Sequence, residues 1–176
     1  MDPRLEKITI ADEDNNEINQ VTRAEMRAGN LIHRATYILV FNSLGYLFVQ
    51  KRTQSKDIYP GHYEIAAGGV VLAGESYELS AQRELQEELG IKSTALRPLF
   101  DNFYDDGQNR VWGRVFACSY NGPLELQETE VESGEFMKIE NVLAMMETHP
   151  FCPDGIGILK RILDEGLVNK LQEKHT

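Results

Sequence analysis

The spacing of hydrophobic residues along the chain changes several times, and each spacing predicts a type of element. Residues 35–52, ATYILVFNSLGYLFVQKR, contain two runs rich in β-branched and aromatic residues, separated by Asn42-Ser43-Leu44-Gly45. Asn and Gly are typical of tight turns, so this segment predicts a β-hairpin. A loop with Pro60-Gly61 follows and leads into a short apolar strand that ends at Gly68-Gly69.

The next segment has a helical period instead. Residues 76–89 place Tyr77, Ala81, Leu85 and Leu89 at helical spacing, and Gly90 stands where a left-handed cap would end the helix. This pattern predicts an amphipathic helix.

The rest of the chain continues with short strands and helices. Alternating apolar and polar residues predict strands at 95–104, 110–120 and 134–139, and helical spacing predicts helices at 141–146 and 155–171. An N-terminal strand at 5–10 precedes a polar stretch, so we expect residues 1–30 to form a flanking strand or hairpin. The order predicts an α/β or α+β sandwich, with a mixed sheet and helices on its faces, as a single domain over 1–176.

The composition of the chain limits the classes of partner that it can bind. The chain has 176 residues, with 18 basic and 28 acidic side chains and a net charge of −10. This charge opposes binding to nucleic acid polymers and to anionic membranes. No apolar run is long enough for a membrane span or a signal peptide, so we expect a cytoplasmic protein, and the sequence is compatible with a homodimer. Cys118 and Cys152 are too few for a disulfide framework or a zinc site.

Three glutamates share one face of the predicted helix. Glu84, Glu87 and Glu88 stand at positions i, i+3 and i+4, and like charges at this spacing each destabilise an isolated helix by roughly 0.2–0.5 kcal/mol. A solvated acidic surface is the simpler explanation. A divalent cation would relieve the repulsion, and compact carboxylate oxygens suit Mg²⁺ or Mn²⁺.

The spacing of the whole segment favours the cation. Residues 69–91 read Gly69, five residues, Glu75, seven residues, Arg83-Glu84-Leu85, one residue, Glu87-Glu88, one residue, Gly90-Ile91. This resembles the Nudix box at all nine defined positions. A chance match in a chain of this length has a probability on the order of 10⁻⁷, so the sequence is identified as a member of the Nudix superfamily.

The resemblance implies a fold and a set of roles. Nudix enzymes cleave a diphosphate linked to another moiety, using a loop–helix–loop element on an α/β/α sandwich. By position, Glu84, Glu87 and Glu88 would be metal ligands, with the Gly69 carbonyl as a further ligand. Arg83 would hold the glutamates through salt bridges. Glu75 would support the helix start, and Leu85 and Ile91 would anchor the element in the core.

The general base is left open between several carboxylates. Hydrolysis needs a group that accepts the proton of the attacking water. Glu84 and Glu87 are candidates within the motif. The acidic loop LQETEVESGE adds Glu128, Glu130 and Glu132, and among these we favour Glu130 because it directly precedes a predicted strand.

A second resemblance concerns the subgroup. The segment KRTQSKDIYPGHYEIAAGG is similar to the corresponding part of isopentenyl diphosphate isomerases, which share the Nudix fold, and so are NNEINQVTRAEM and HRATYILV. Those isomerases need a cysteine and a metal-binding histidine at positions that align with Gly68 and Val70. Neither residue here can perform that chemistry, so the sequence predicts hydrolysis on an isomerase-like scaffold.

Basic residues outside the helix are candidates for diphosphate binding. Arg52 and Lys56 follow the predicted hairpin, where their charge would favour an anionic substrate; Arg34, Arg110 and Arg114 could serve similarly. The four histidines, His33, His62, His149 and His175, show no ligand spacing. We expect each of them in a loop or on the surface.

Three functions remain open from the sequence. The first is a Mg²⁺-dependent Nudix hydrolase that acts on a nucleoside diphosphate derivative or a related small diphosphate. The second is an isopentenyl diphosphate isomerase, which the lack of a cysteine at Gly68 disfavours. The third is a ligand-sensing Nudix module without turnover, which the intact set of glutamates disfavours.

Overall fold

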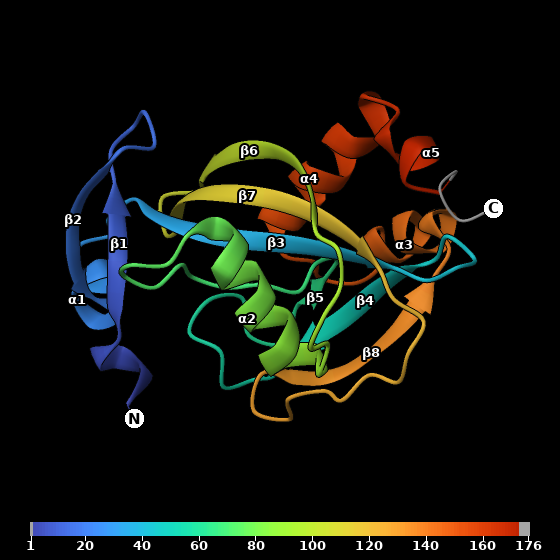
Figure 1. Cartoon of the computed structure of the whole chain (residues 1–176), viewed down its shortest axis with the longest axis horizontal. Coiled ribbons are helices and arrows are strands. Elements are labelled where there is room, and N and C mark those ends of the chain that lie inside the picture. Colours follow the sequence, from blue (N-terminus) through green and yellow to red (C-terminus); the bar gives the residue numbers. More distant parts are fainter. Residues whose placement is uncertain (1, 173–176) are drawn as a thin grey trace.

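A computed structural model describes residues 2–172 of the chain (Figure 1). Its strands form one mixed sheet. They are β1 (Lys7–Ala11), β2 (Glu17–Thr22), β3 (His33–Phe41), β4 (Leu47–Arg52), β5 (Tyr63–Glu64), β6 (Arg97–Asp105), β7 (Arg110–Ser119) and β8 (Val131–Met137). The pair β3–β7 is parallel and the other pairs are antiparallel. The predicted mixed sheet is confirmed.

The helices are short and lie on both sides of this sheet. They are η1 (Pro3–Leu5), α1 (Arg23–Ala28), α2 (Tyr77–Leu89), α3 (Ile139–Met146), α4 (Pro153–Asp164) and α5 (Leu167–Gln172). The prediction of a single C-terminal helix over 155–171 is wrong, because this segment forms two helices, α4 and α5. It is interrupted at Gly166, whose backbone has φ +63°, a conformation that a continuing right-handed helix cannot contain.

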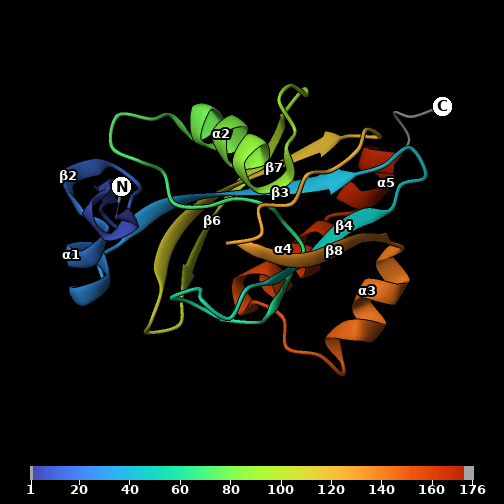
Figure 2. The same ribbon diagram turned by 90° about the horizontal axis from the view of Figure 1, so that it is seen from below.

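The alternation along β3 sends side chains into two separate cores. Leu39 and Phe41 pack with α3 and α4, whereas Ile38 and Val40 pack with α2. Figure 2 shows α2 on one side of β3 and the helices α3 and α4 on the other. Helices therefore cover both faces of the sheet, which is the expected α/β/α sandwich.

The predicted hairpin exists but its strands diverge. β3 and β4 pair only next to the turn, at Phe41 and Leu47. Beyond that pair, β3 runs parallel to β7 over 33–41, and β4 pairs with β8. The strands separate because each finds a longer partner elsewhere in the sheet. The segment between β5 and α2 crosses the gap, and its isolated bridges join Ala67 to Ile38 and Val70 to Ala35.

Local signals fix the ends of α2. The Ser76 side chain accepts a hydrogen bond from the Leu79 amide, and Gly90 ends the helix with φ +71°. Tyr77, Ala81, Leu85 and Leu89 are all buried against the sheet. The predicted helix and both of its ends are confirmed, and its opposite side is free to carry charge.

The N-terminal segment packs against the body at one end of the sheet. β1 and β2 form a hairpin, and β1 joins β3 through the pair Ile10 and His33. Helix α1, which the sequence pattern did not predict, starts with a capping box between Thr22 and Glu25. Within residues 2–172, every helix falls short of the length and apolar content that a membrane crossing requires.

Candidate active site

Helix α2 and the loops facing it enclose a groove of about 440 Å³. We call it the acidic groove. Its helical side carries Arg83, Glu84, Glu87 and Glu88, and its other walls include Lys56, Gly68, Gly69, Glu130 and Arg23. The structure thus brings the three predicted metal-binding glutamates to one surface, together with residues more than twenty positions away in either direction.

Arg83 organises the carboxylates at this surface. Its Nε and Nη2 donate to Glu75 at 2.8 and 3.0 Å, and its Nη1 donates to Glu84 at 2.7 Å and to Glu87 at 3.1 Å. The planar guanidinium can satisfy several carboxylates in fixed directions. Arg83 therefore holds Glu84 and Glu87 by ion pairs, and the role of these two glutamates as metal ligands stays a prediction.

Glu88 is the most deeply placed of the three glutamates. One oxygen, Oε2, accepts hydrogen bonds from the Gly68 amide at 3.1 Å and from Gln50 Nε2 at 3.2 Å. Burial, with the charges of Glu84 and Glu64 nearby, raises the pKa of Glu88 to about 8. Burial also raises the pKa of Glu84, although the Arg83 charge opposes it. For both carboxylates, the effect of burial outweighs that of the nearby cations.

Among the described residues, each of the three glutamates uses one of its oxygens as an acceptor. Glu84 Oε1, Glu87 Oε2 and Glu88 Oε2 accept the hydrogen bonds just described. No residue in the described part of the chain donates to the other oxygen of each pair. Across residues 2–172, however, no three His, Cys, Asp or Glu side chains are gathered closely enough to enclose a metal ion.

Two further features fit the residues to a divalent cation. Gln50 directs its Nε2 to Glu64 and Glu88, and its Oε1 is buried without a hydrogen-bond partner among the described residues. A buried oxygen in this state costs free energy unless a donor or a cation approaches. In addition, a Cβ at Gly69 would lie 2.5 Å from Glu84 Oε1, so only glycine lets the backbone come this close to the carboxylate. The carboxylates of Glu84, Glu87 and Glu88 supply hard oxygen atoms, which Mg²⁺ prefers.

The Gly69 carbonyl has a partner already. It accepts a hydrogen bond from the Thr36 amide at 2.9 Å. The Thr36 hydroxyl donates to the same oxygen at 3.5 Å, so the predicted role of this carbonyl as a metal ligand requires that long contact to give way.

Of the predicted substrate contacts, Lys56 reaches the acidic groove directly. Its ammonium group is hydrogen-bonded to Glu130. Its charge offsets part of the rise that burial causes in the pKa values of Glu84 and Glu88. Arg52 lies deeper, where it binds Glu64 and the Ile58 carbonyl. Of the three loop glutamates considered as a base, only Glu130 lines the groove, since Glu132 pairs with Lys51 and Glu128 is exposed.

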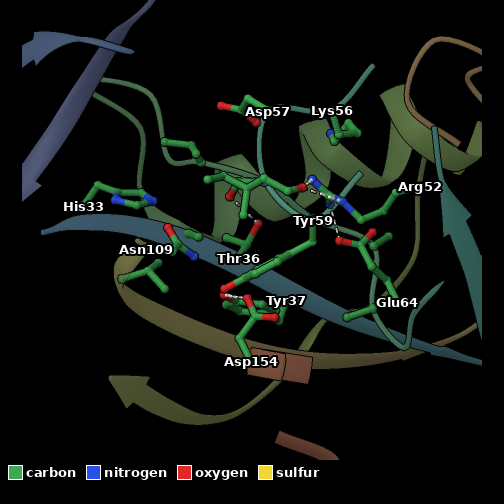
Figure 3. Close-up of a pocket in the computed structure, with 18 of the residues that line it drawn as sticks. His33, Thr36, Tyr37, Arg52, Lys56, Asp57, Tyr59, Glu64, Asn109 and Asp154 are labelled. Atoms are coloured by element: carbon green, nitrogen blue, oxygen red, sulfur yellow. Dashed lines mark hydrogen bonds and ion pairs between the residues drawn. The ribbon is translucent and has the colours of Figure 1, made fainter. Parts of the chain in front are cut away.

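A second, smaller cavity of about 110 Å³ adjoins the acidic groove. We call it the side cavity; Figure 3 shows His33, Thr36, Tyr37, Arg52, Tyr59, Asn109 and Asp154 around it. It shares Gly68, Gly69 and Val70 with the groove, along with Arg23, Lys56 and Asp57. The two spaces are therefore neighbours across one extended segment.

Several residues in or beside these two sites were not predicted from the sequence. His33, expected in a loop or at the surface, is a buried residue that begins β3, because its strand is covered there by the N-terminal hairpin. Arg23 and Arg27 come from α1, which was not predicted. Gln50 lies in an ordinary strand sequence, and no local signal marks it. Arg34, Arg110 and Arg114 line neither space and instead pair with Asn15, Asp105 and Asp101.

Gly68 also bears on the isomerase alternative. Its φ is +145°, and a Cβ there would lie 2.0 Å from the Thr36 carbonyl oxygen. A cysteine at this position would need the backbone to move. The local fold therefore has no room for the residue that isomerase chemistry requires.

The chain is similar to known sequences over most of its length. The model of the NUDIX domain matches residues 31–154. An uncharacterised Nudix hydrolase of Pseudomonas aeruginosa, PA4841, is 45% identical over 90% of this chain and 94% of its own. The uncharacterised Nudix hydrolase YfcD of Escherichia coli K12 is 39% identical over 97% of this chain and 94% of its own.

Solved structures share the fold at lower identity. DR0079 from Deinococcus radiodurans superposes with a TM-score of 0.76 at 23% identity, covering 89% of this chain and 98% of its own. The NUDIX domain of Shewanella oneidensis NrtR, complexed with ADP ribose, gives a TM-score of 0.62 at 16% identity, covering 82% of this chain and 99% of its own.

Proposed function

This chain belongs to the Nudix family of hydrolases, and from that membership we propose that it hydrolyses a diphosphate bond in a small molecule with the help of Mg²⁺, which Mn²⁺ could replace. The substrate class is a nucleoside diphosphate derivative or a related diphosphate ester. One observation carries the proposal: Glu84, Glu87 and Glu88 each keep one carboxylate oxygen without a donor from the described residues, on the wall of one groove.

These three glutamates would hold the metal after drawing closer together than they stand in the protein alone, with the Gly69 carbonyl as a further ligand. When bound, Mg²⁺ neutralises charge on the phosphoryl oxygens and makes the attacking water more acidic. Arg83 keeps Glu84 and Glu87 in place, because its guanidinium donates to both. Gly68 and Gln50 do the same for Glu88.

Lys56 and Glu130 have linked roles in this proposal. In the protein alone they form an ion pair within the acidic groove. A diphosphate in the groove is a stronger acceptor for the Lys56 ammonium, since it carries more charge than one carboxylate. Glu130 then loses its partner and is free to accept the proton of the attacking water, as a general base must. Arg52 lies in the wall of the side cavity, where it pairs with Glu64.

Turnover on a defined panel tests the proposal. The panel contains nucleoside di- and triphosphates, dinucleotides, sugar nucleotides and prenyl diphosphates, each with Mg²⁺ and with EDTA. We expect Mg²⁺-dependent release of phosphate or of a monophosphate from at least one member. Glu87→Gln should keep the fold, because half of this side chain is exposed, and should lose most of the turnover, by at least about 100-fold.

Glu78→Gln is the matched control, since it removes a carboxylate from the exposed first turn of the same helix, outside the groove. It should keep wild-type turnover. Full activity of Glu87→Gln would contradict the assigned cluster. Tight binding without turnover on any substrate would favour the sensing module, and formation of the isomeric diphosphate from isopentenyl diphosphate would favour the isomerase.

A further inference from the structure

The side cavity is placed to receive the part of the substrate that is not phosphate. It adjoins the acidic groove along Gly68, Gly69 and Val70. A diphosphate bound between the α2 glutamates and Lys56 would thus direct one of its substituents toward this cavity. The chemistry of the cavity walls then indicates which substituents can bind.

His33 presents a hydrogen-bond acceptor to the side cavity. Only 2% of this residue is exposed, and its Nδ1 lies 3.2 Å from the Leu31 carbonyl oxygen. A carbonyl can only accept, so Nδ1 must carry the hydrogen. Burial and the Arg27 charge lower the pKa of His33 to about 4, so the ring is neutral at pH 7. Nε2 is then an acceptor, and no side chain or amide within 2–172 donates to it.

Asn109 presents a donor on the same wall. Its Oδ1 accepts a hydrogen bond from Arg27 Nη1 at 3.3 Å. A guanidinium can only donate, so this contact fixes which end of the amide is oxygen. The Nδ2 group keeps its hydrogens for another partner, since no acceptor for them is found among the described residues. Figure 3 shows the His33 ring and the Asn109 amide projecting into the cavity together.

Tyr37, which lies on the same strand as His33, adds a second acceptor. The Tyr37 hydroxyl donates to Asp154 Oδ2 at 2.7 Å, and this uses its only hydrogen. The Tyr37 oxygen therefore has lone pairs left for a donor from a ligand. Two acceptors and one donor around the same cavity match a ligand with more than one hydroxyl group, because each hydroxyl both donates and accepts.

Size and polarity disfavour the common alternatives. The cavity of about 110 Å³ is smaller than the roughly 150 Å³ cavity that accommodates one benzene ring, so a nucleobase is a poorer fit for it than a short acyclic group. An isoprenoid chain would fit poorly for another reason. It would leave His33 Nε2 and Asn109 Nδ2 without partners, at a cost for each of them, whereas Tyr37 keeps its hydrogen bond to Asp154.

We propose that the side cavity binds a short hydroxyl-bearing group attached to the diphosphate, such as an acyclic polyol, rather than a nucleobase or an isoprenoid chain. This inference rests on the proposed function, because the diphosphate anchors the group. His33 and Asn109 are its specificity-determining residues.

Binding of non-hydrolysable esters tests the inference without turnover. The probes are the 2,3-dihydroxypropyl, propyl and uridine 5′-esters of methylenebisphosphonate, titrated calorimetrically with Mg²⁺ into the full-length protein. We expect the dihydroxypropyl ester to bind at least about tenfold more tightly than the propyl ester, as two additional hydrogen bonds would give. Equal or tighter binding of the propyl or the uridine ester overturns the inference.

Variants assign the preference to the cavity. His33→Phe keeps an aromatic ring but removes the acceptor, and should lower the affinity for the dihydroxypropyl ester to near that for the propyl ester, leaving the propyl ester unchanged. His149→Phe, at an exposed histidine, should keep the preference. A preference that persists in His33→Phe overturns the inference. If free methylenebisphosphonate with Mg²⁺ does not bind at all, the proposed function fails together with it.

Discussion

At the scale of single residues, Arg83 is the group on which the acidic groove most depends. It donates to Glu75, Glu84 and Glu87 in different directions from one planar fork. The Nudix box gave this role in advance, since the motif fixes all four residues. The motif does not predict the buried positions of Gln50 and His33, because their surroundings come from segments that are distant in sequence.

Replacing Arg83 by lysine tests its positioning role. Lysine keeps the charge but cannot hold three carboxylates in fixed directions. We expect Arg83→Lys to lose about 10–100-fold in Mn²⁺ affinity, measured by titration calorimetry, with a comparable loss in kcat. Arg110→Lys alters an ion pair with Asp105 outside the groove and should change neither quantity. Wild-type Mn²⁺ affinity in Arg83→Lys would show that the fork is dispensable.

His33 gives the protein a sensitivity to acid. Burial lowers the pKa of His33 to about 4, from an ordinary value of 6.5. Between these values the unfolded chain binds a proton that the folded protein refuses, so stability falls as the pH falls from 6.5 toward 4. The loss amounts to roughly 3 kcal/mol by pH 4.

Urea unfolding at several pH values measures this effect. The free energy of unfolding of His33→Phe should decline less steeply from pH 6.5 to pH 4 than that of the wild type. His149→Phe should decline as the wild type does. An identical slope for His33→Phe and the wild type would mean that His33 is protonated in the folded protein.

At the scale of elements, those with strong local signals were predicted well. Helix α2 has a Ser cap, a helical apolar period and Gly90, and each can be recognised from neighbouring residues alone. The divergence of β3 and β4 was not predictable in this way, because it depends on pairing with β7 and β8, far along the chain. Helix α1 escaped notice because it has only one buried side chain, Met26.

The end of α2 offers a direct test of such a local signal. Gly90 has φ +71°, and a Cβ there would lie 2.8 Å from Glu125 Cβ. We expect Gly90→Ala to lower the free energy of unfolding by at least about 1–2 kcal/mol. Gly157→Ala is the matched control, since Gly157 lies exposed within α4 with no atom near the added methyl group. It should raise stability by about 0.5–1 kcal/mol. Equal effects of the two changes would contradict this account of the cap.

At the scale of the whole molecule, the acidic groove couples folding to pH and to metal. Without a cation, the pKa of Glu88 is about 8 in the folded protein against 4.5 for the free side chain. Between pH 4.5 and pH 8 the folded protein therefore binds more protons than the unfolded chain, and this group lowers stability as the pH rises. The net charge of −10 acts in the same direction.

Thermal unfolding in EDTA and in Mg²⁺ measures this coupling. In EDTA, the Tm of the wild type should fall between pH 6 and pH 8, and Glu88→Gln should fall less. Mg²⁺ should raise the wild-type Tm more at pH 8 than at pH 6, because the carboxylates must be ionised to bind it. A Glu88→Gln variant with the same decline in EDTA as the wild type would remove Glu88 from this explanation.

The central claim is that Glu84, Glu87 and Glu88 hold a divalent cation beside a diphosphate. A crystal structure with Mn²⁺ and methylenebisphosphonate, with the metal located from its anomalous scattering, tests it most directly. The account predicts a Mn²⁺ peak in contact with oxygens of these three glutamates, and Lys56 moved from Glu130 to a phosphonate oxygen. A Mn²⁺-free groove at saturating metal, with the Lys56–Glu130 ion pair intact, would contradict it.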